Sequence, residues 1–270
     1  MTYCARTDPG LCSEEVYTRE TPYPDGMLLD MHVHSCHSID SMTDIGAIVR
    51  TWQKRRILSL VCDHDSIEGS RRVYGEIRRY EPDIPLLLAE EITTEEGEII
   101  GAFLTEEIPP GLSAAETLDR IQDQGAVSIV PHPFCTFRST AIRREVLQEC
   151  IGRIDVVEGY NARSPVPEEN EMAQAYARGC SKPVSVGSDA HIPVELGRTY
   201  ARLPPFEGPK DFVRAVSAAE IVFQKTHPAV HSVSRMVKSA KRAVGDEQSS
   251  IRPRRRAALP EWPGIVKTLL

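Results

Sequence analysis

The sequence predicts an α/β barrel, and three observations point to that fold. Short apolar runs alternate with longer segments of helical periodicity from residue 28 to about residue 224. The apolar runs are nearly continuous, as in strands of a largely parallel sheet that is covered on both faces. Seven such units in a chain of 270 residues suit one closed barrel better than an open sheet.

Hydrophobic periodicity and the residues that begin or end elements predict the individual strands and helices. Apolar runs predict strands at residues 28–33, 57–61, 85–88, 99–104, 126–130, 154–157 and 183–186. Helical periodicity predicts helices at residues 45–54, 69–80, 113–124, 142–151 and 168–178. The helix at 113–124 opens on Ser113 with Glu116 three residues later, which is the pattern of a capping box.

The two ends differ from this central domain at residues 28–224. Residues 1–27 contain no periodic element, and we treat them as an N-terminal extension. Residues 225–270 combine a predicted helix at 230–244 with the sequence RPRRR and resemble a helical, partly flexible basic tail. From residue 231 onward, nine Lys and Arg residues face three Asp and Glu residues, although the whole chain has a net charge of −7.

Composition indicates a soluble globular enzyme of the cytoplasm. Apolar residues make up 41% and charged residues 26% of the chain, which is ordinary for such a protein. The seven cysteines are odd in number and form no CxxC, so we expect reduced thiols. No apolar stretch is long enough for a membrane span, and the N-terminus does not resemble a signal peptide. Nothing in the sequence predicts an oligomeric state.

Metal-ligand residue types gather where the predicted strands end. Five predicted strands lead into the segments DMHVHS (30–35), CDHD (62–65), EEIT (90–93), PHP (131–133) and GSDAH (187–191). In the first segment the i, i+2 spacing puts Asp30, His32 and His34 on one face of the strand. The carboxyl ends of parallel strands meet at one rim, so the five segments are expected to converge.

This ligand set predicts a multinuclear metal site. Imidazole nitrogen with carboxylate oxygen suits zinc, manganese or iron. Several carboxylates among the histidines favour two or three divalent ions, because a carboxylate can bridge two metals. Such a cluster activates water and neutralises phosphate oxygens, which suits phosphoester hydrolysis. An isolated HxH is more often a hydrogen-bonded pair than a metal site. Five such clusters at the ends of five predicted strands, however, are not explained by chance.

In this order, the same segments resemble the motifs of the polymerase and histidinol phosphatase (PHP) superfamily. The resemblance covers roughly residues 28–202, and the stretches EEGEIIGAFL, PHPF…FR and Asn161-Ala162-Arg163 are similar to its small stand-alone phosphoesterase branch. It implies a distorted (β/α)7 barrel with a trinuclear metal centre and phosphoesterase activity.

The resemblance also implies roles for single residues. It makes His32, His34 and Asp189 ligands of a first metal. It makes Glu91 the bridge to a second metal, which His132 would also bind.

A third metal would have Asp40, His64 and His191 as ligands. Asp30 and Asp63 resemble carboxylates that lie behind the ligands and orient their imidazole rings.

Catalytic and substrate-binding residues are expected among the same segments. We expect Glu91, Asp189 and His191 to take part in catalysis. Arg138 and Arg163 follow the fifth and sixth predicted strands, and their guanidinium groups match phosphate oxygens. A role in ordinary ion pairs is equally open for both arginines.

One departure from the family pattern concerns the second metal. Many PHP proteins carry a further histidine between the bridging Glu and the equivalent of His132, but no histidine occurs between His64 and His132 here. The second metal is left with Glu91, His132, solvent and room for one unrecognised group, and Cys135 is a weak candidate for it. We therefore expect one of three metals to exchange readily.

The sequence thus predicts a metal-dependent phosphoric ester hydrolase in which a metal-bound hydroxide attacks a small phosphomonoester, such as a nucleotide or sugar phosphate. A nuclease acting on oligonucleotide ends, with the basic tail on the phosphate backbone, is the less favoured alternative. A non-catalytic metal-binding regulatory protein also remains open. An amidohydrolase with a bridging lysine is disfavoured, since no lysine lies in a candidate motif. The chain also lacks a GxSxG, a P-loop and a strand-linked GxGxxG.

Overall fold

The structure, a computed structural model, describes Tyr23 and residues 26–249, with side chains up to residue 243. Most of the predicted N-terminal extension, and the RPRRR part of the predicted tail, lie outside the described residues. Within the described part, none of the helices is long and apolar enough to cross a membrane.

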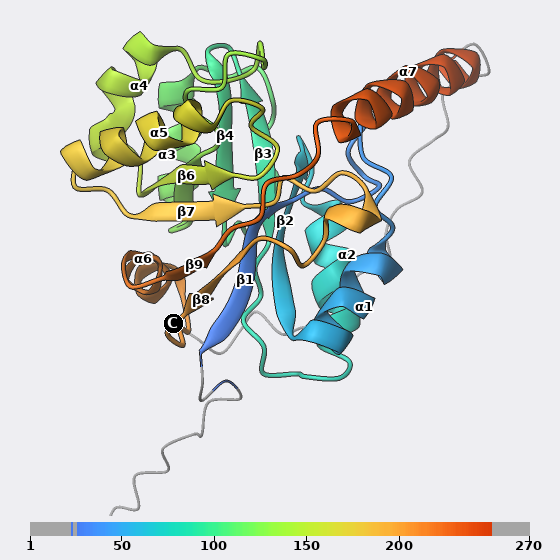
Figure 1. The fold of residues 1–270 in the computed structure, drawn as a ribbon, viewed down its shortest axis with the longest axis horizontal. Coiled ribbons are helices and arrows are strands. Elements are labelled where there is room, and N and C mark those ends of the chain that lie inside the picture. Colours follow the sequence, from blue (N-terminus) through green and yellow to red (C-terminus); the bar gives the residue numbers. More distant parts are fainter. Residues whose placement is uncertain (1–22, 24–25, 250–270) are drawn as a thin grey trace, which may run out of the picture.

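A mixed sheet forms the centre of the fold (Figure 1). Its strands in the described residues are β1 (Met27–Val33), β2 (Ile57–His64), β3 (Ala89–Thr94), β4 (Gly97–Ala102), β5 (Val127–Val130), β6 (Val156–Asn161), β7 (Val184–Gly187), β8 (Tyr200–Leu203) and β9 (Glu220–Val222). They lie side by side in the order β7-β6-β5-β4-β3-β2-β1-β8-β9. The sheet curls until the segment after β7 meets β1, where Val33 bridges to Ala190 and the His34 N–H donates to the Ala190 carbonyl at 2.9 Å. The expected distorted barrel is therefore confirmed.

Helices cover the outside of this barrel. They are α1 (Ile45–Arg55), α2 (Glu68–Ile77), α3 (Ala114–Asp123), α4 (Arg144–Cys150), α5 (Pro167–Gly179), α6 (Pro209–Ser217) and α7 (Val230–Ser249), with short 3-10 turns at Ile151–Arg153 and Pro193–Glu195. The predicted capping box at Ser113 and Glu116 is present at the start of α3. In Figure 1, α7 crosses above the loops that follow β1, away from the other helices.

One strand prediction was wrong. Residues 85–88 form no strand; β3 begins at Ala89, so Glu90 and Glu91 lie within the strand rather than after it. The apolar side chains of Leu87 and Leu88 are buried all the same, which explains why the run resembled a strand. In addition, β4 runs antiparallel to both β3 and β5, because Glu95 and Glu96 form a two-residue turn between β3 and β4.

Alternation along β1 separates the core from the site. Leu29, Met31 and Val33 are fully buried in a hydrophobic cluster that includes Trp52 of α1 and Tyr74 of α2. Successive side chains of a strand point to opposite faces, so the residues between them project into the barrel.

Candidate metal centre

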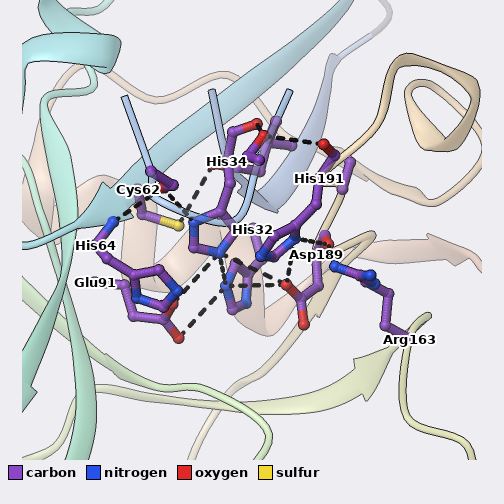
Figure 2. A network of polar contacts seen from close by, with 12 residues as sticks. His32, His34, Cys62, His64, Glu91, Arg163, Asp189 and His191 are labelled. Carbon is purple, nitrogen blue, oxygen red and sulfur yellow. Dashed lines mark hydrogen bonds and ion pairs between the residues drawn. The ribbon is translucent and has the colours of Figure 1, made fainter. Parts of the chain in front are cut away.

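Two imidazoles from the end of β1 and one carboxylate from β3 form the middle of the site. His32 Nε2 lies 3.1 Å from His34 Nε2. Glu91 places Oε1 3.5 Å from His32 Nε2 and Oε2 3.3 Å from His34 Nε2. All three side chains are fully buried. Figure 2 shows them turned toward one another, so the predicted ligands from two separate strands do converge.

Hydrogen bonds behind these rings fix which nitrogen carries the proton. His32 Nδ1 lies 3.0 Å from Glu158 Oε1, and His34 Nδ1 lies 3.0 Å from Ser38 Oγ. The Ser38 hydroxyl donates its hydrogen to Asp63 at 2.6 Å, so it can only accept from His34. Both rings are therefore assigned a proton on Nδ1 and a free lone pair on Nε2, as metal-binding histidines require.

Asp189 enters the same space from the loop after β7. Its Oδ1 lies 3.8 Å from His32 Nε2, 3.6 Å from His34 Nε2 and 3.4 Å from His191 Nδ1. Its backbone is left-handed, with φ of 54°, and the N–H donates to the His32 carbonyl at 2.8 Å. Gly187 permits this close approach, because a Cβ there would lie 2.3 Å from His32 Cβ.

His132 and Glu98 form the second side of the site. His132 Nε2 lies 3.1 Å from Glu91 Oε1 and 3.7 Å from Glu98 Oε2. Glu98 projects from β4, is 3% exposed, and places Oε1 3.6 Å from His64 Nδ1. Glu98 is therefore a candidate for the unrecognised group that the sequence left open at the second metal.

A third cluster lies nearer the surface. Asp40, in the loop after β1, places Oδ1 3.4 Å from His191 Nε2 and Oδ2 3.6 Å from His64 Nε2. His64 Nδ1 also lies 3.2 Å from Glu91 Oε2, which connects this cluster to the interior. The side chains of Asp40 and His64 are 14% and 17% exposed.

The ligand-type side chains thus form two groups, and only the outer one contains partly exposed members, Asp40 and His64, beside the buried His191. The deep group consists of His32, His34, Glu91, Glu98, His132 and Asp189. The outer group consists of Asp40, His64 and His191.

The residues present fit divalent metal ions. Seven buried carboxylate oxygens have no hydrogen-bond partner among the described residues, and four of them belong to the two groups: Asp40 Oδ1, Glu91 Oε2, Glu98 Oε2 and Asp189 Oδ1. Each of these four faces imidazole nitrogens at 3.2 to 3.8 Å. Two atoms about 2.1 Å from one tetrahedral ion lie about 3.4 Å apart, which matches this spacing. Buried polar atoms without partners are rare and costly, so an ion explains them.

The electrostatics of the carboxylates agree with that fit. Burial alone would raise the pKa of Glu91, but His32 and His64 hold that pKa well below its usual range. Burial and the neighbouring Glu91 instead raise the pKa of Glu98. A divalent cation between these two carboxylates would offset their repulsion.

The two predicted arginines occupy different positions. Arg138 forms an ion pair with Asp189 Oδ2, and its side chain is 19% exposed. Burial would raise the pKa of Asp189, but Arg138 and His32 hold it well below its usual range. Arg163 is 4% exposed, donates to Ser234 Oγ at 2.8 Å and pairs with Glu195 at 3.4 Å. The structure thus brings Arg138 to the site, whereas Arg163 lies behind Asp189 (Figure 2).

The two carboxylates expected to orient imidazoles contact other groups. Asp30 accepts hydrogen bonds from the backbone N–H groups of Ser188 at 2.8 Å and His32 at 3.4 Å. Asp63 accepts four hydrogen bonds from the backbone and hydroxyl groups of Ser35 and Ser38. Asp63 therefore reaches an imidazole only through Ser38, and Asp30 contacts no imidazole ring directly.

The sequence motifs did not include Glu98 and Glu158, which both lie beside imidazoles of the site. Glu158 supports His32 through Oε1 and accepts from the His132 N–H through Oε2 at 2.7 Å. Both are isolated glutamates within apolar strands, and a charged residue in such a run was the available signal.

Comparisons with known proteins agree with the fold and the motifs. A family described as PHP-associated matches residues 167–221. The uncharacterized protein MJ0417 of Methanocaldococcus jannaschii is 35% identical over 197 residues, which cover 69% of this chain and 78% of that protein. The uncharacterized protein MJ1587 of the same organism is 35% identical over 121 residues, which cover 40% of this chain and 68% of that protein.

A solved structure has a similar fold at low sequence identity. It is a two-domain protein of Bacteroides vulgatus, described as containing a predicted PHP-like metal-dependent phosphoesterase. The TM-score is 0.55 at 17% identity, over 73% of this chain and 65% of that one. This chain therefore spans slightly less than two thirds of the two-domain protein. The match to the PHP-associated family, with the ordered motifs, shows that the chain belongs to the PHP superfamily; the solved structure shows the shared fold.

Proposed function

We propose that the protein is a metal-dependent phosphoesterase that hydrolyses a small phosphomonoester, such as a nucleotide or sugar phosphate. The observation that carries this proposal is the set of four unpartnered, buried carboxylate oxygens that face imidazole nitrogens. The barrel shared with a protein described as containing a PHP-like phosphoesterase supports the same activity.

Two or three divalent ions, such as manganese, zinc or iron, would be held by the two groups. In the deep group, His32, His34 and Asp189 would form one set of ligands, and His132 with Glu98 would form another. Glu91 has one oxygen toward each set, so it would bridge them. When bound, such ions lower the pKa of a water molecule and neutralise phosphoryl oxygens.

The protein's own side chains supply the remaining chemistry. Asp189 stays ionised at neutral pH, because the Arg138 guanidinium outweighs the effect of burial and holds the pKa of Asp189 well below its usual range. Asp189 therefore offers an acceptor that can orient an attacking water. Arg138 remains protonated and partly exposed beside Asp189, so its guanidinium group can turn to a phosphate oxygen. The buried ligands exclude bulk water from the reacting centre.

The nuclease alternative receives less support from the described part of α7. Lys241 donates to three backbone carbonyls, and Lys238 lies beside Asp40. These two lysines face the barrel rather than forming a basic stripe along an open groove, which is how proteins grip a nucleic-acid backbone.

A substrate screen tests the proposal. Metal-reconstituted protein should be offered sugar phosphates, mononucleotides and short oligonucleotides with terminal phosphates. We expect phosphate release from at least one small phosphomonoester and slower or absent cleavage of internal phosphodiester bonds. Cleavage of oligonucleotides together with no turnover of any small phosphoester would replace this proposal with the nuclease.

A further inference from the structure

The helix α7 contacts the barrel through polar side chains. His231, Ser234, Lys238 and Lys241 share one face at i, i+3, i+7 and i+10 spacing, and all are buried or half-buried. Met236, by contrast, is 72% exposed on the same helix. Surface helices usually dock by an apolar stripe. Val230 of α7 is also buried, but most of the inward side chains are polar, so they serve contacts other than apolar packing.

The ammonium group of Lys241 donates all of its hydrogens to the loop that carries Asp40. Its Nζ donates to the carbonyls of Cys36 at 3.0 Å, Ser38 at 2.7 Å and Ser41 at 2.7 Å. An ammonium group has three hydrogens, so these carbonyls use all of its donors. Lys241 therefore fastens α7 to the loop and holds that loop in one conformation.

Lys238, one turn earlier, is differently placed. Its Nζ lies 3.7 Å from Asp40 Oδ2, and its side chain is 39% exposed. This ion pair is the one polar contact of its ammonium group among the described residues. Donors thus remain free at the solvent side of the outer group. His64 and His191 lie against the same Asp40 carboxylate.

We propose that Lys238 is a substrate-binding residue that donates to a phosphate oxygen at the outer group, and that Lys241 is the positioning residue that keeps Asp40 and Lys238 in place. This inference rests on the proposed phosphoesterase function and adds a residue to it. A phosphomonoester carries close to two negative charges, and a lysine on a flexible stem recognises such a group as a point charge. The half-exposed position lets Lys238 reach an entering phosphate.

The test compares three variants of the full-length, metal-reconstituted chain with the wild type. Lys238→Met removes the charge, Lys238→Arg restores one, and Arg242→Met removes a charge from an exposed residue of the same helix that has no ion pair among the described residues. Binding of inorganic phosphate is measured by calorimetry, and bound metal by elemental analysis. Lys238→Met should bind phosphate about tenfold more weakly, which is the loss expected for one charged hydrogen bond.

The controls separate binding from folding. Metal content of Lys238→Met should equal that of the wild type, Lys238→Arg should recover most of the phosphate affinity, and Arg242→Met should bind as the wild type does. In turnover, Lys238→Met should raise KM more than it lowers kcat. Equal phosphate affinity in Lys238→Met and Arg242→Met would overturn the role of Lys238 while leaving the phosphoesterase intact. A wild-type protein that neither binds phosphate nor hydrolyses any phosphoester would instead refute the proposed function.

Lys241→Met tests the positioning role by a readout other than activity. Amide hydrogen exchange of residues 36–43 should become faster, because the three carbonyls lose their common donor. The metal held by the outer group should also dissociate more readily. Unchanged exchange in this loop and unchanged metal affinity would show that Lys241 does not position Asp40.

Discussion

The deep group and the outer group of the metal centre are built in different ways. Most of the deep group comes from strands that lie side by side or from the residues directly after them, and its members are at most 3% exposed. In the outer group, Asp40 comes from a loop that Lys241 of α7 fastens, and it is 14% exposed. Strands or the residues directly after them therefore place most of the deep ligands, whereas in the outer group Asp40 depends on loop contacts and His64 is the last residue of β2.

This difference has consequences for affinity and for substrate access. Rigid, preformed ligands lose little conformational entropy when an ion binds, so the deep group should hold metal more firmly. Loops with exposed hydrogen bonds open locally at lower free energy than core strands. We expect any readily exchanging metal to belong to the outer group, and not to the second position as the missing histidine had indicated.

The largest effect should follow the loss of a deep imidazole. His34→Ala removes one ligand from the centre of the deep group, and hydrolysis should fall on the order of a hundredfold to a thousandfold. Elemental analysis should show less bound metal. His227→Ala, at an exposed histidine outside both groups, should keep its metal and activity. If His34→Ala retained the full metal content, the deep group would not be the tight site.

Glu98→Gln should have a smaller effect that is confined to one side of the deep group. The amide keeps the shape of the side chain but removes the charge that faces His132. Metal affinity should fall about tenfold to a hundredfold, similar to the loss of a supporting carboxylate. Glu95→Gln, at an exposed residue three positions earlier, is the matched control. Equal metal titrations of the two variants would contradict the assignment of Glu98 as a ligand.

Ser38→Ala tests the support behind a ligand. The hydroxyl links His34 Nδ1 to Asp63, so its removal frees the ring to change tautomer or orientation. We expect activity to fall about tenfold, at the lower end of such supporting contacts. Thr43→Val is a suitable control, because the Thr43 hydroxyl is buried nearby without a hydrogen-bond partner among the described residues. A Ser38→Ala variant as active as Thr43→Val would mean that the backbone alone orients His34.

The smallest effect is expected from truncation after Val244. This deletion leaves Lys238 and Lys241 in place, so both groups should keep their contacts. Hydrolysis of small phosphoesters should change less than twofold, a difference of about 0.4 kcal/mol in activation free energy. A strong loss of oligonucleotide hydrolysis, with a flatter salt dependence of that hydrolysis, would instead indicate that the basic tail binds nucleic acid.

Sequence patterns predicted the parts of the fold that depend on local periodicity. The alternation of Asp30, His32 and His34 with apolar neighbours predicted which face of β1 enters the barrel. The reversed direction of β4 escaped prediction, because an apolar run has no direction of its own. The segment 85–88 was mistaken for a strand, since burial of Leu87 and Leu88 does not require pairing with a neighbouring strand.

The site was predictable where ligands occur in compact motifs and not where they stand alone. Glu98 belongs to none of the motifs found in the sequence. Its proximity to His132 depends on the antiparallel pairing of β4 with β5. The contact of Lys241 with the loop after β1 spans 205 positions in the sequence at its longest. Long-range contacts of this kind depend on tertiary packing, which periodicity does not encode.

Hydrolysis of a phosphomonoester should depend on metal held by the deep and outer groups. This dependence is tested most directly by following turnover and metal content together while a chelator removes the ions and manganese or zinc is returned. We expect activity to disappear with the metal of the deep group and to return when that metal is restored. Unchanged turnover in protein shown by elemental analysis to be free of metal would contradict this expectation.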